Sequence, residues 1–258
     1  MDDDQKRRRL FEEDRGGLAF REIFTPTREG PLPKRSHPRP SGKGGPSVNP
    51  TPPPAVTSVW SAADATANGM VLSNGGSTVT VTNTALGNVW QILRGTVSKT
   101  SGKLYIEYST STGMVTTFHA GLASAGVNIN SYLGDSNYSA GMNPIAGAVF
   151  VSAGFTSGGP FTNLGNFISG DVMALAVDLT IGNVWLAKNN VWFGSGVPGE
   201  EINLLDGENP IVTFIPATVG ALFPSMAFST AGSSGVWTLQ STAASQKYTP
   251  PAGYSAWG

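Results

Sequence analysis

Short runs of alternating hydrophobic and polar residues follow one another from residue 57 to the C-terminus. The runs 77–83 (STVTVTN) and 103–111 (KLYIEYSTS) have a period of two, which directs successive side chains to opposite faces of a β-strand. In the second run one face carries Leu104, Ile106 and Tyr108, and the other carries Tyr105 and Glu107. Both runs are therefore expected to form strands.

The longest patterned stretch, residues 171–193, predicts a strand, a turn at 180–183, a second strand, a turn at 189–190 and a short third strand. Turns rich in Gly, Asn and Ser separate the runs, and no segment after residue 57 has a 3.6-residue apolar period of helical length. About 200 residues are enough for one sandwich with a substantial core. The sequence predicts an all-β domain over residues 57–258, built as a two-sheet antiparallel β-sandwich.

Residues 1–29 have a different texture, with many charges and few apolar side chains. A short helix over residues 2–15 would end at Gly16-Gly17, but isolated helices shorter than about 12–15 residues are marginal in water. The apolar residues that a partner could bind are Leu10, Phe11, Leu18, Phe20, Ile23 and Phe24. We expect this segment to be an arm that docks on another protein; the alternative is a disordered tail with scattered hydrophobic residues.

Residues 30–56 are rich in proline and glycine and contain PLPKRSHPRPSGKGGPSVNPTPPP. Proline favours an extended polyproline-II path at about 3.1 Å per residue, so this segment could span up to about 75 Å. The segment is expected to be a linker that provides reach. A ligand for a proline-binding domain is the alternative.

The charges divide between the two parts of the chain. The net charge is −1, but residues 1–43 hold 11 Lys or Arg and 8 Asp or Glu, whereas the remainder holds 5 and 9. The predicted sandwich therefore lacks the clustered cations that bind nucleic-acid phosphates. The chain contains no cysteine. It has neither the roughly 18–20 consecutive apolar residues of a membrane span nor the apolar region of an export signal, so no membrane insertion is expected.

Taken in order, these segments resemble the SPRY domain family, especially the type attached to phage and prophage structural proteins. The most specific match is SGDVMALAVDLTIGNVWLAKNNVWFGSG, which has a Gly-Asp turn, a buried strand, a Gly-Asn turn and a strand with two Trp residues around Lys-Asn. Other matching segments are VWSAADATANGMVLSNGGSTVTVTN, VWQILRGTVSKTSGKLYIEYS, HAGLASAGVNINSYLGDS, LFPSMAFSTAGSSGVWTLQ and YTPPAGYSAW. The resemblance covers residues 59–257 and is weakest at 143–166 and 199–218, where such domains place their binding surface. It implies recognition without catalysis.

The residues themselves also argue against an enzyme. His37 lies in the linker and His119 in a strand pattern, so the two histidines cannot form a relay or a metal pair, and His119 is expected to be packed or hydrogen-bonded. Asp171 and Asp178 would point to opposite faces of one strand, and Asp171 suits a turn after Gly170. No nucleophile-elbow, P-loop or zinc-protease motif is present. We therefore predict no catalysis, no cofactor and no resident metal.

Two further sets of residues are candidates for binding an ion or a ligand. An acidic loop that could attract calcium, although its spacing matches no EF-hand, contains Glu200, Glu201, Asp206 and Glu208. Strand-like runs place four Trp in the core, namely Trp90, Trp185, Trp192 and Trp237. Aromatic residues and one amide in Gly/Ser/Asn-rich loops are the candidates for ligand binding, namely Tyr132, Tyr138, Asn143, Phe155 and Phe161. The alternative for these residues is that they fold inward and cap the sandwich.

An arm, a spacer and a charge-poor head together indicate a particle component that assembles in the host cytoplasm and functions in the virion. We expect a tail fibre, head fibre or spike that attaches to the host surface, with a glycan as ligand and several copies supplying avidity. The arm would bind other virion proteins, and the protein would be a homo-oligomer in the particle. The alternatives are a capsid or tail decoration protein that binds only virion proteins, and an intracellular peptide-binding SPRY adaptor.

Overall fold

A computed structural model describes residues 56–82, 90–112, 118–194, 204, 207–229 and 234–258. The chain divides into a unit of residues 1–51 and a unit of residues 52–258, and every described residue belongs to the second unit. The docking residues predicted between 10 and 24, and the linker up to residue 55, lie outside the described residues. The same is true of Glu200, Glu201 and Asp206 in the predicted acidic loop.

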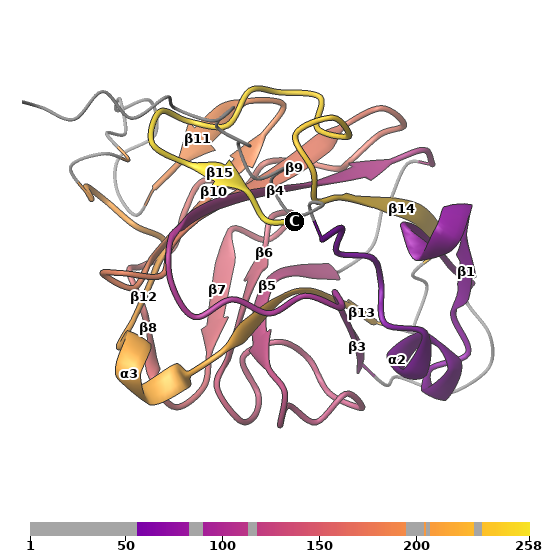
Figure 1. The fold of residues 1–258 in the computed structure, drawn as a ribbon, viewed down its shortest axis with the longest axis horizontal. Helices are drawn as coiled ribbons and strands as arrows, with labels where there is room; N and C mark the ends of the chain where they lie inside the picture. The colour runs from indigo at the N-terminus through magenta and orange to yellow at the C-terminus, as the bar shows by residue number, and fades with distance from the viewer. Residues whose placement is uncertain (1–55, 83–89, 113–117, 195–203, 205–206, 230–233) are drawn as a thin grey trace, which may run out of the picture. The chain divides into compact units, whose positions relative to one another are not determined.

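Two β-sheets pack face to face in the second unit (Figure 1). The main path of the first sheet is, in spatial order, β1 (Val71–Ser73), β2 (Thr78–Val81), β14 (Gly235–Gln240), β4 (Lys103–Thr110), β9 (Val172–Asp178), β10 (Asn183–Lys188), β12 (Val212–Phe214) and β8 (Phe155–Ser157). Two short strands extend this sheet: β11 (Val191–Phe193) pairs with β10, and β15 (Ser255–Ala256) lies parallel to β4. The second sheet contains β3 (Trp90–Arg94), β13 (Leu222–Ser229), β5 (Phe118–Ser124), β6 (Ser139–Asn143) and β7 (Ala148–Val151). All pairings except that of β15 are antiparallel, so the predicted all-β sandwich is confirmed.

The alternation in β4 decides which side chains enter the core. Leu104, Ile106 and Tyr108 are buried between the two sheets. Tyr105 points the other way, into a second cluster on the outer face of the first sheet. The two faces expected from the sequence are therefore confirmed, because a two-residue period leaves each side chain only one side of the sheet.

The outer face of each sheet is covered by a segment from elsewhere in the chain. The C-terminal residues cover the first sheet, where Tyr254 packs with Tyr105 and Trp185. Trp257 enters the main core, and its indole N–H donates to the Val97 carbonyl over 2.9 Å. The loop after β5 covers the second sheet, where Val127 and Leu133 pack with Ile92 of β3. Both sheets are thus buried over much of both faces, which explains strands such as β9 in which every residue is buried.

The turns predicted around β10 are present. Gly182 has φ +82°, and a Cβ atom there would lie 1.8 Å from the Phe214 carbonyl oxygen, so only glycine fits this turn. Asn189 and Asn190 have φ of 50° and 66°, a left-handed conformation that asparagine tolerates better than most residues. The three strands predicted within 171–193 are therefore confirmed as β9, β10 and β11.

The part of the chain that the structure describes contains three short helical segments: α2 (Ala62–Ala67), the 3₁₀ turn η1 (Asn74–Gly76) and α3 (Pro216–Val219). Ser61 caps α2 by accepting the Asp64 N–H, and the Asp64 carboxylate binds the Arg94 guanidinium at 2.8 Å. This ion pair ties α2 to β3. In Figure 1, α3 lies beside β8 and β12, and α2 lies at the opposite end of the sandwich.

Candidate functional site

The residues predicted to bind ligand divide into two groups. Tyr132 is half-buried and Tyr138 is 37% exposed, so both reach the surface. Asn143, Phe155 and Phe161 are only 4%, 7% and 6% exposed. The expectation that these three present open faces to a ligand is therefore corrected.

Each of the three buried residues has an internal partner. Phe155 opens β8 and packs its ring 5.2 Å from that of Phe214 on the neighbouring strand. Phe161 belongs to the main core. The Asn143 side-chain oxygen accepts the N–H groups of the two residues Ile145 and Ala146 and so closes the β6–β7 turn. These side chains cap the sandwich, which was the alternative left open by the sequence.

Four rings from separate parts of the chain meet on the outer face of the second sheet. The aromatic cluster, as we name it, consists of Trp90 on β3, His119 on β5, Tyr132 in the loop after β5 and Phe150 on β7. His119 lies between Trp90 and Phe150, with centroid distances of 4.3 and 4.5 Å. Tyr132 lies edge-on to the other three rings at 5.7 to 6.0 Å. Trp90, Tyr132 and Phe150 are each half-buried, so all three offer some ring surface to solvent.

The histidine at the centre of the cluster is buried and neutral. His119 is 1% exposed, and its Nδ1 lies 3.3 Å from the Leu133 carbonyl oxygen. Burial lowers the pKa of His119 to about 4, although the contact with the carbonyl acts in the opposite direction. A neutral ring that donates from Nδ1 leaves Nε2 as an acceptor, and Nε2 has no hydrogen-bond partner among the described residues. The expectation that His119 is a packed, hydrogen-bonded residue is confirmed.

Glycine residues allow the loop to lie directly on the sheet beside this cluster. A Cβ atom on Gly141 of β6 would lie 2.6 Å from the Leu133 Cβ atom. A Cβ atom on Gly134, where φ is +97°, would lie 2.3 Å from the Phe150 carbonyl carbon. The loop and strands β6 and β7 therefore approach too closely for larger residues, and this contact sets the position of Tyr132.

The described parts of segments 143–166 and 199–218, where the sequence resemblance is weakest, contact each other. β8 pairs with β12, the Gly158 N–H donates to the Ile211 carbonyl over 2.8 Å, and the Ile215 N–H donates to Gly154 over 3.3 Å. Tyr138 has φ +48°, an unusual conformation for a bulky residue, and a Cβ on Gly154 would lie 2.9 Å from its ring. Ile215 is 64% exposed. This end of the sandwich therefore presents an apolar surface around Tyr138 and Ile215.

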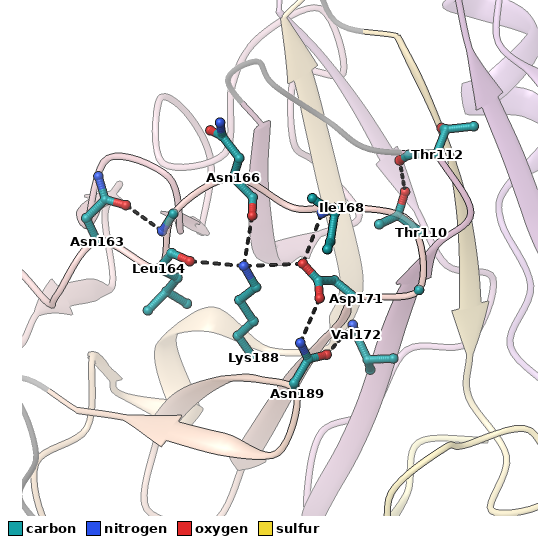
Figure 2. Close-up of polar contacts among 12 residues, drawn as sticks. Thr110, Thr112, Asn163, Leu164, Asn166, Ile168, Asp171, Val172, Lys188 and Asn189 are labelled. Carbon is teal, nitrogen blue, oxygen red and sulfur yellow. Dashed lines mark hydrogen bonds and ion pairs between the residues drawn. The ribbon is translucent and has the colours of Figure 1, made fainter.

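A lysine holds one of these divergent segments against the first sheet. Figure 2 shows the Lys188 ammonium group between the carbonyl oxygens of Leu164, at 3.0 Å, and Asn166, at 2.9 Å, with a carboxylate oxygen of Asp171 at 3.3 Å. The same ammonium lies 4.5 Å from the centroid of the Phe167 ring. The Lys188 side chain is 17% exposed, so these contacts are largely shielded from water. Lys188 thus fixes the chain between β8 and β9.

Asp171 completes this anchor in the role that its turn position predicted. Its carboxylate accepts the Ile168 N–H at 3.0 Å and the Asn189 side-chain amide at 2.7 Å (Figure 2). Burial alone raises the pKa of Asp171, but the hydrogen bonds from Asn189, Ile168 and Lys188 outweigh it and hold the pKa below its ordinary value. Asp171 is therefore a structural carboxylate in an ion pair.

The second conspicuous carboxylate, Glu107, is fully buried and bonded to three donors. Its oxygens accept the Tyr105 hydroxyl at 2.6 Å, the Lys247 N–H at 2.7 Å and the Tyr248 N–H at 2.9 Å. These bonds hold the C-terminal segment on β4. Of the four acidic residues in the predicted loop, the structure describes Glu208. Glu208 is exposed, and its backbone carbonyl accepts the Trp185 indole N–H at 2.8 Å.

The described residues form neither a metal-binding cluster nor a membrane-spanning helix. Within them, no three histidine or acidic side chains come close enough to hold a metal ion. In the same part of the chain, no helix has the length and apolar character needed to cross a membrane.

Comparison with known proteins gives structural similarity alone. No family model matches the chain, and no curated protein matches it. Two similar solved structures are the SPRY domain of human HERC1 and a human SPRY domain. The first is 14% identical with a TM-score of 0.45, over 66% of this chain and 91% of that chain. The second is 17% identical with a TM-score of 0.41, over 66% of this chain and 93% of that chain.

Proposed function

We propose that this chain is a non-catalytic recognition protein of the SPRY type, and that its sandwich binds ligand at the aromatic cluster. The observation that supports this most is the group of three half-buried rings, Trp90, Tyr132 and Phe150, around a neutral histidine. A flat apolar ring face beside hydrogen-bonding groups is a common design for small-ligand sites. The loop that carries Tyr132 also exposes the side chains of Asn128 and Asn130.

The chemistry of this surface favours a neutral, hydroxyl-rich ligand such as a glycan. Sugar rings present C–H groups to an aromatic face and hydroxyl groups to amides. The predicted sandwich has only 5 Lys or Arg after residue 43, so a strongly anionic ligand would find little compensation. One shallow site of this kind binds weakly, and several copies on one particle would raise the overall affinity through tethering.

We further propose that the chain is a fibre or spike that attaches a phage or phage-like particle to its host. It rests on the succession of a charged segment with apolar residues, a proline-rich spacer and a charge-poor head in the sequence. The first segment would bind other virion proteins, and the head would bind a host-surface glycan or receptor.

Binding of the full chain to a glycan array and to intact host cells tests the proposal. We expect retention of the chain on cells and selection of neutral oligosaccharides on the array. Cells that retain no protein, together with an array without signal, would remove the attachment claim.

Paired substitutions locate the site. Tyr132→Ala removes one ring of the cluster, and we expect binding to fall at least tenfold, because stacking of a flat ligand on an aromatic side chain is worth about 1–3 kcal/mol where it has been measured for nucleobases. Tyr248→Ala is the matched control, because Tyr248 is a half-buried tyrosine near the C-terminus whose backbone N–H holds Glu107. Equal losses in the two variants would contradict the assignment.

The apolar end around Tyr138 and Ile215 favours the alternatives in which the partner is a protein. Exposed apolar side chains beside an unusual backbone conformation are typical of protein contacts. In a decoration protein the partner would be another virion protein, and in an adaptor it would be a peptide. Ile215→Ser should abolish incorporation into particles in the first case and leave glycan binding unchanged; unchanged incorporation would contradict that alternative.

A further inference from the structure

The second sheet ends in a strand with no charge and no proline. β7 has the sequence Ala-Val-Phe-Val, and its partner in the sheet is β6. All four residues of β7 are half-buried. Edge strands in soluble proteins are usually protected by charge, proline, a bulge or a covering segment, because their free backbone groups pair with other strands.

The phase of the β6–β7 ladder identifies the free groups. The Ser152 N–H donates to the Ser139 carbonyl at 3.0 Å, and bonded residues alternate along an antiparallel pair. Phe150 and Ala148 therefore face β6 with their N–H and C=O groups. Val149 and Val151 direct theirs away from β6, and no hydrogen bond joins these groups to any residue that the structure describes.

The opposite edge of the same sheet is protected. On β3 the Ile92 N–H donates to Ile129, and the Ile92 carbonyl accepts the side-chain amide of Asn68 at 3.0 Å. β3 also ends in Arg94. Because the β3 edge is protected and the β7 edge is not, β7 is the edge of this sheet that can pair with another strand.

We propose that β7 pairs with β7 of a second copy of this chain. The free groups lie symmetrically about Phe150, so a two-fold axis at Phe150 places Val149 of each copy opposite Val151 of the other. Each such pair exchanges two N–H···O=C bonds, which gives four hydrogen bonds and satisfies every free group. Identical strands can lie side by side because β7 carries no like charges to repel each other.

This pairing also makes the head bivalent. It joins two five-stranded sheets into one of ten strands. The two-fold axis of an antiparallel strand pair is perpendicular to the sheet, so both aromatic clusters lie on the same side. Two ligand surfaces on one side can bind one repetitive surface together. The dimer does not depend on the proposed ligand, so each proposal can fail without the other.

Sedimentation of the full chain over a range of micromolar concentrations tests the pairing. We expect a reversible change from the mass of one chain to the mass of two. Val149→Pro removes the outward N–H group at the edge and should weaken dimerisation at least tenfold. Val149→Ala is the matched control, because it loses similar packing and keeps the N–H group; its dimerisation should stay within about threefold of the natural chain.

Amide hydrogen exchange in the natural chain supplies a second measurement in case the proline variant does not fold. The Val149 and Val151 amides should exchange more slowly at high concentration than at low concentration, while the Phe150 amide, bonded within the monomer, should change little. A chain that stays monomeric throughout overturns the proposal. So does a dimer that folded Val149→Pro leaves intact, or one in which the Val149 and Val151 amides remain unprotected.

Discussion

His119 makes the stability of the sandwich depend on pH. Its pKa is about 4 in the folded protein, against an ordinary value of 6.5, because the ring is buried among apolar side chains. Below pH 6.5 His119 is therefore protonated in the unfolded chain, whereas in the folded protein it stays neutral down to about pH 4. The free energy of unfolding must fall across this interval as the pH falls.

The size of the effect follows from the two pKa values. At roughly 1.4 kcal/mol for each pH unit between them, the loss is about 3 kcal/mol, complete by about pH 4 and absent above pH 7. His119→Phe keeps a ring between Trp90 and Phe150 and removes the titrating group. The variant should lose about 3 kcal/mol less than the natural chain between pH 7 and pH 4.

Urea unfolding followed by tryptophan fluorescence at several values between pH 7 and pH 4 measures this difference, and subtraction of the two profiles cancels all other titrating groups. The Cε1 proton resonance of His119 should also keep its neutral position down to about pH 5. Parallel profiles for the natural chain and His119→Phe would refute the reasoning, as would a His119 resonance that titrates near pH 6.5.

Three further substitutions test contacts that hold the surface in place. Lys188→Met removes a charged donor from two carbonyls and a carboxylate, and should lower the free energy of unfolding by about 3 kcal/mol in urea titrations. The control Lys247→Met removes a contact with one exposed carbonyl and should change the free energy of unfolding by less than about 0.5 kcal/mol. Equal effects of the two substitutions would contradict the role of Lys188 as an anchor. Gly182→Ala, which drives a Cβ atom to 1.8 Å from the Phe214 oxygen, should cost more than about 2 kcal/mol in thermal unfolding, and an unchanged Tm would be incompatible with the turn. Glu107→Gln weakens three hydrogen bonds to a buried carboxylate and should speed amide exchange in the C-terminal segment. Unchanged exchange would show that Glu107 does not hold this segment on β4.

Local patterns predicted those parts of the fold that local sequence determines. The alternation in β4 placed Tyr105 and Ile106 on opposite faces because a strand has only two faces. The turn at Gly182 was predicted because few residues adopt positive φ. The short helix α2 was not, because six residues with one capping serine show no helical period.

The candidate site was predicted only in part, because it depends on contacts between distant segments. Its Gly/Ser/Asn-rich loop predicts that Tyr132 reaches the surface, but the strand pattern predicts Trp90 in the core and gives no signal for Phe150. Their meeting at His119 depends on the order β3-β13-β5-β6-β7, which no local pattern reveals. The direction of Phe155 was equally hidden, since a three-residue strand has too little alternation to distinguish its faces.

The most direct test of ligand binding at the aromatic cluster is paramagnetic broadening by a spin-labelled oligosaccharide selected on the array. If the cluster is the site, side-chain resonances of Trp90, Tyr132 and Phe150 should broaden first and recover when unlabelled oligosaccharide is added. Broadening centred instead on Trp192, which packs against the outer face of the first sheet, would contradict the account.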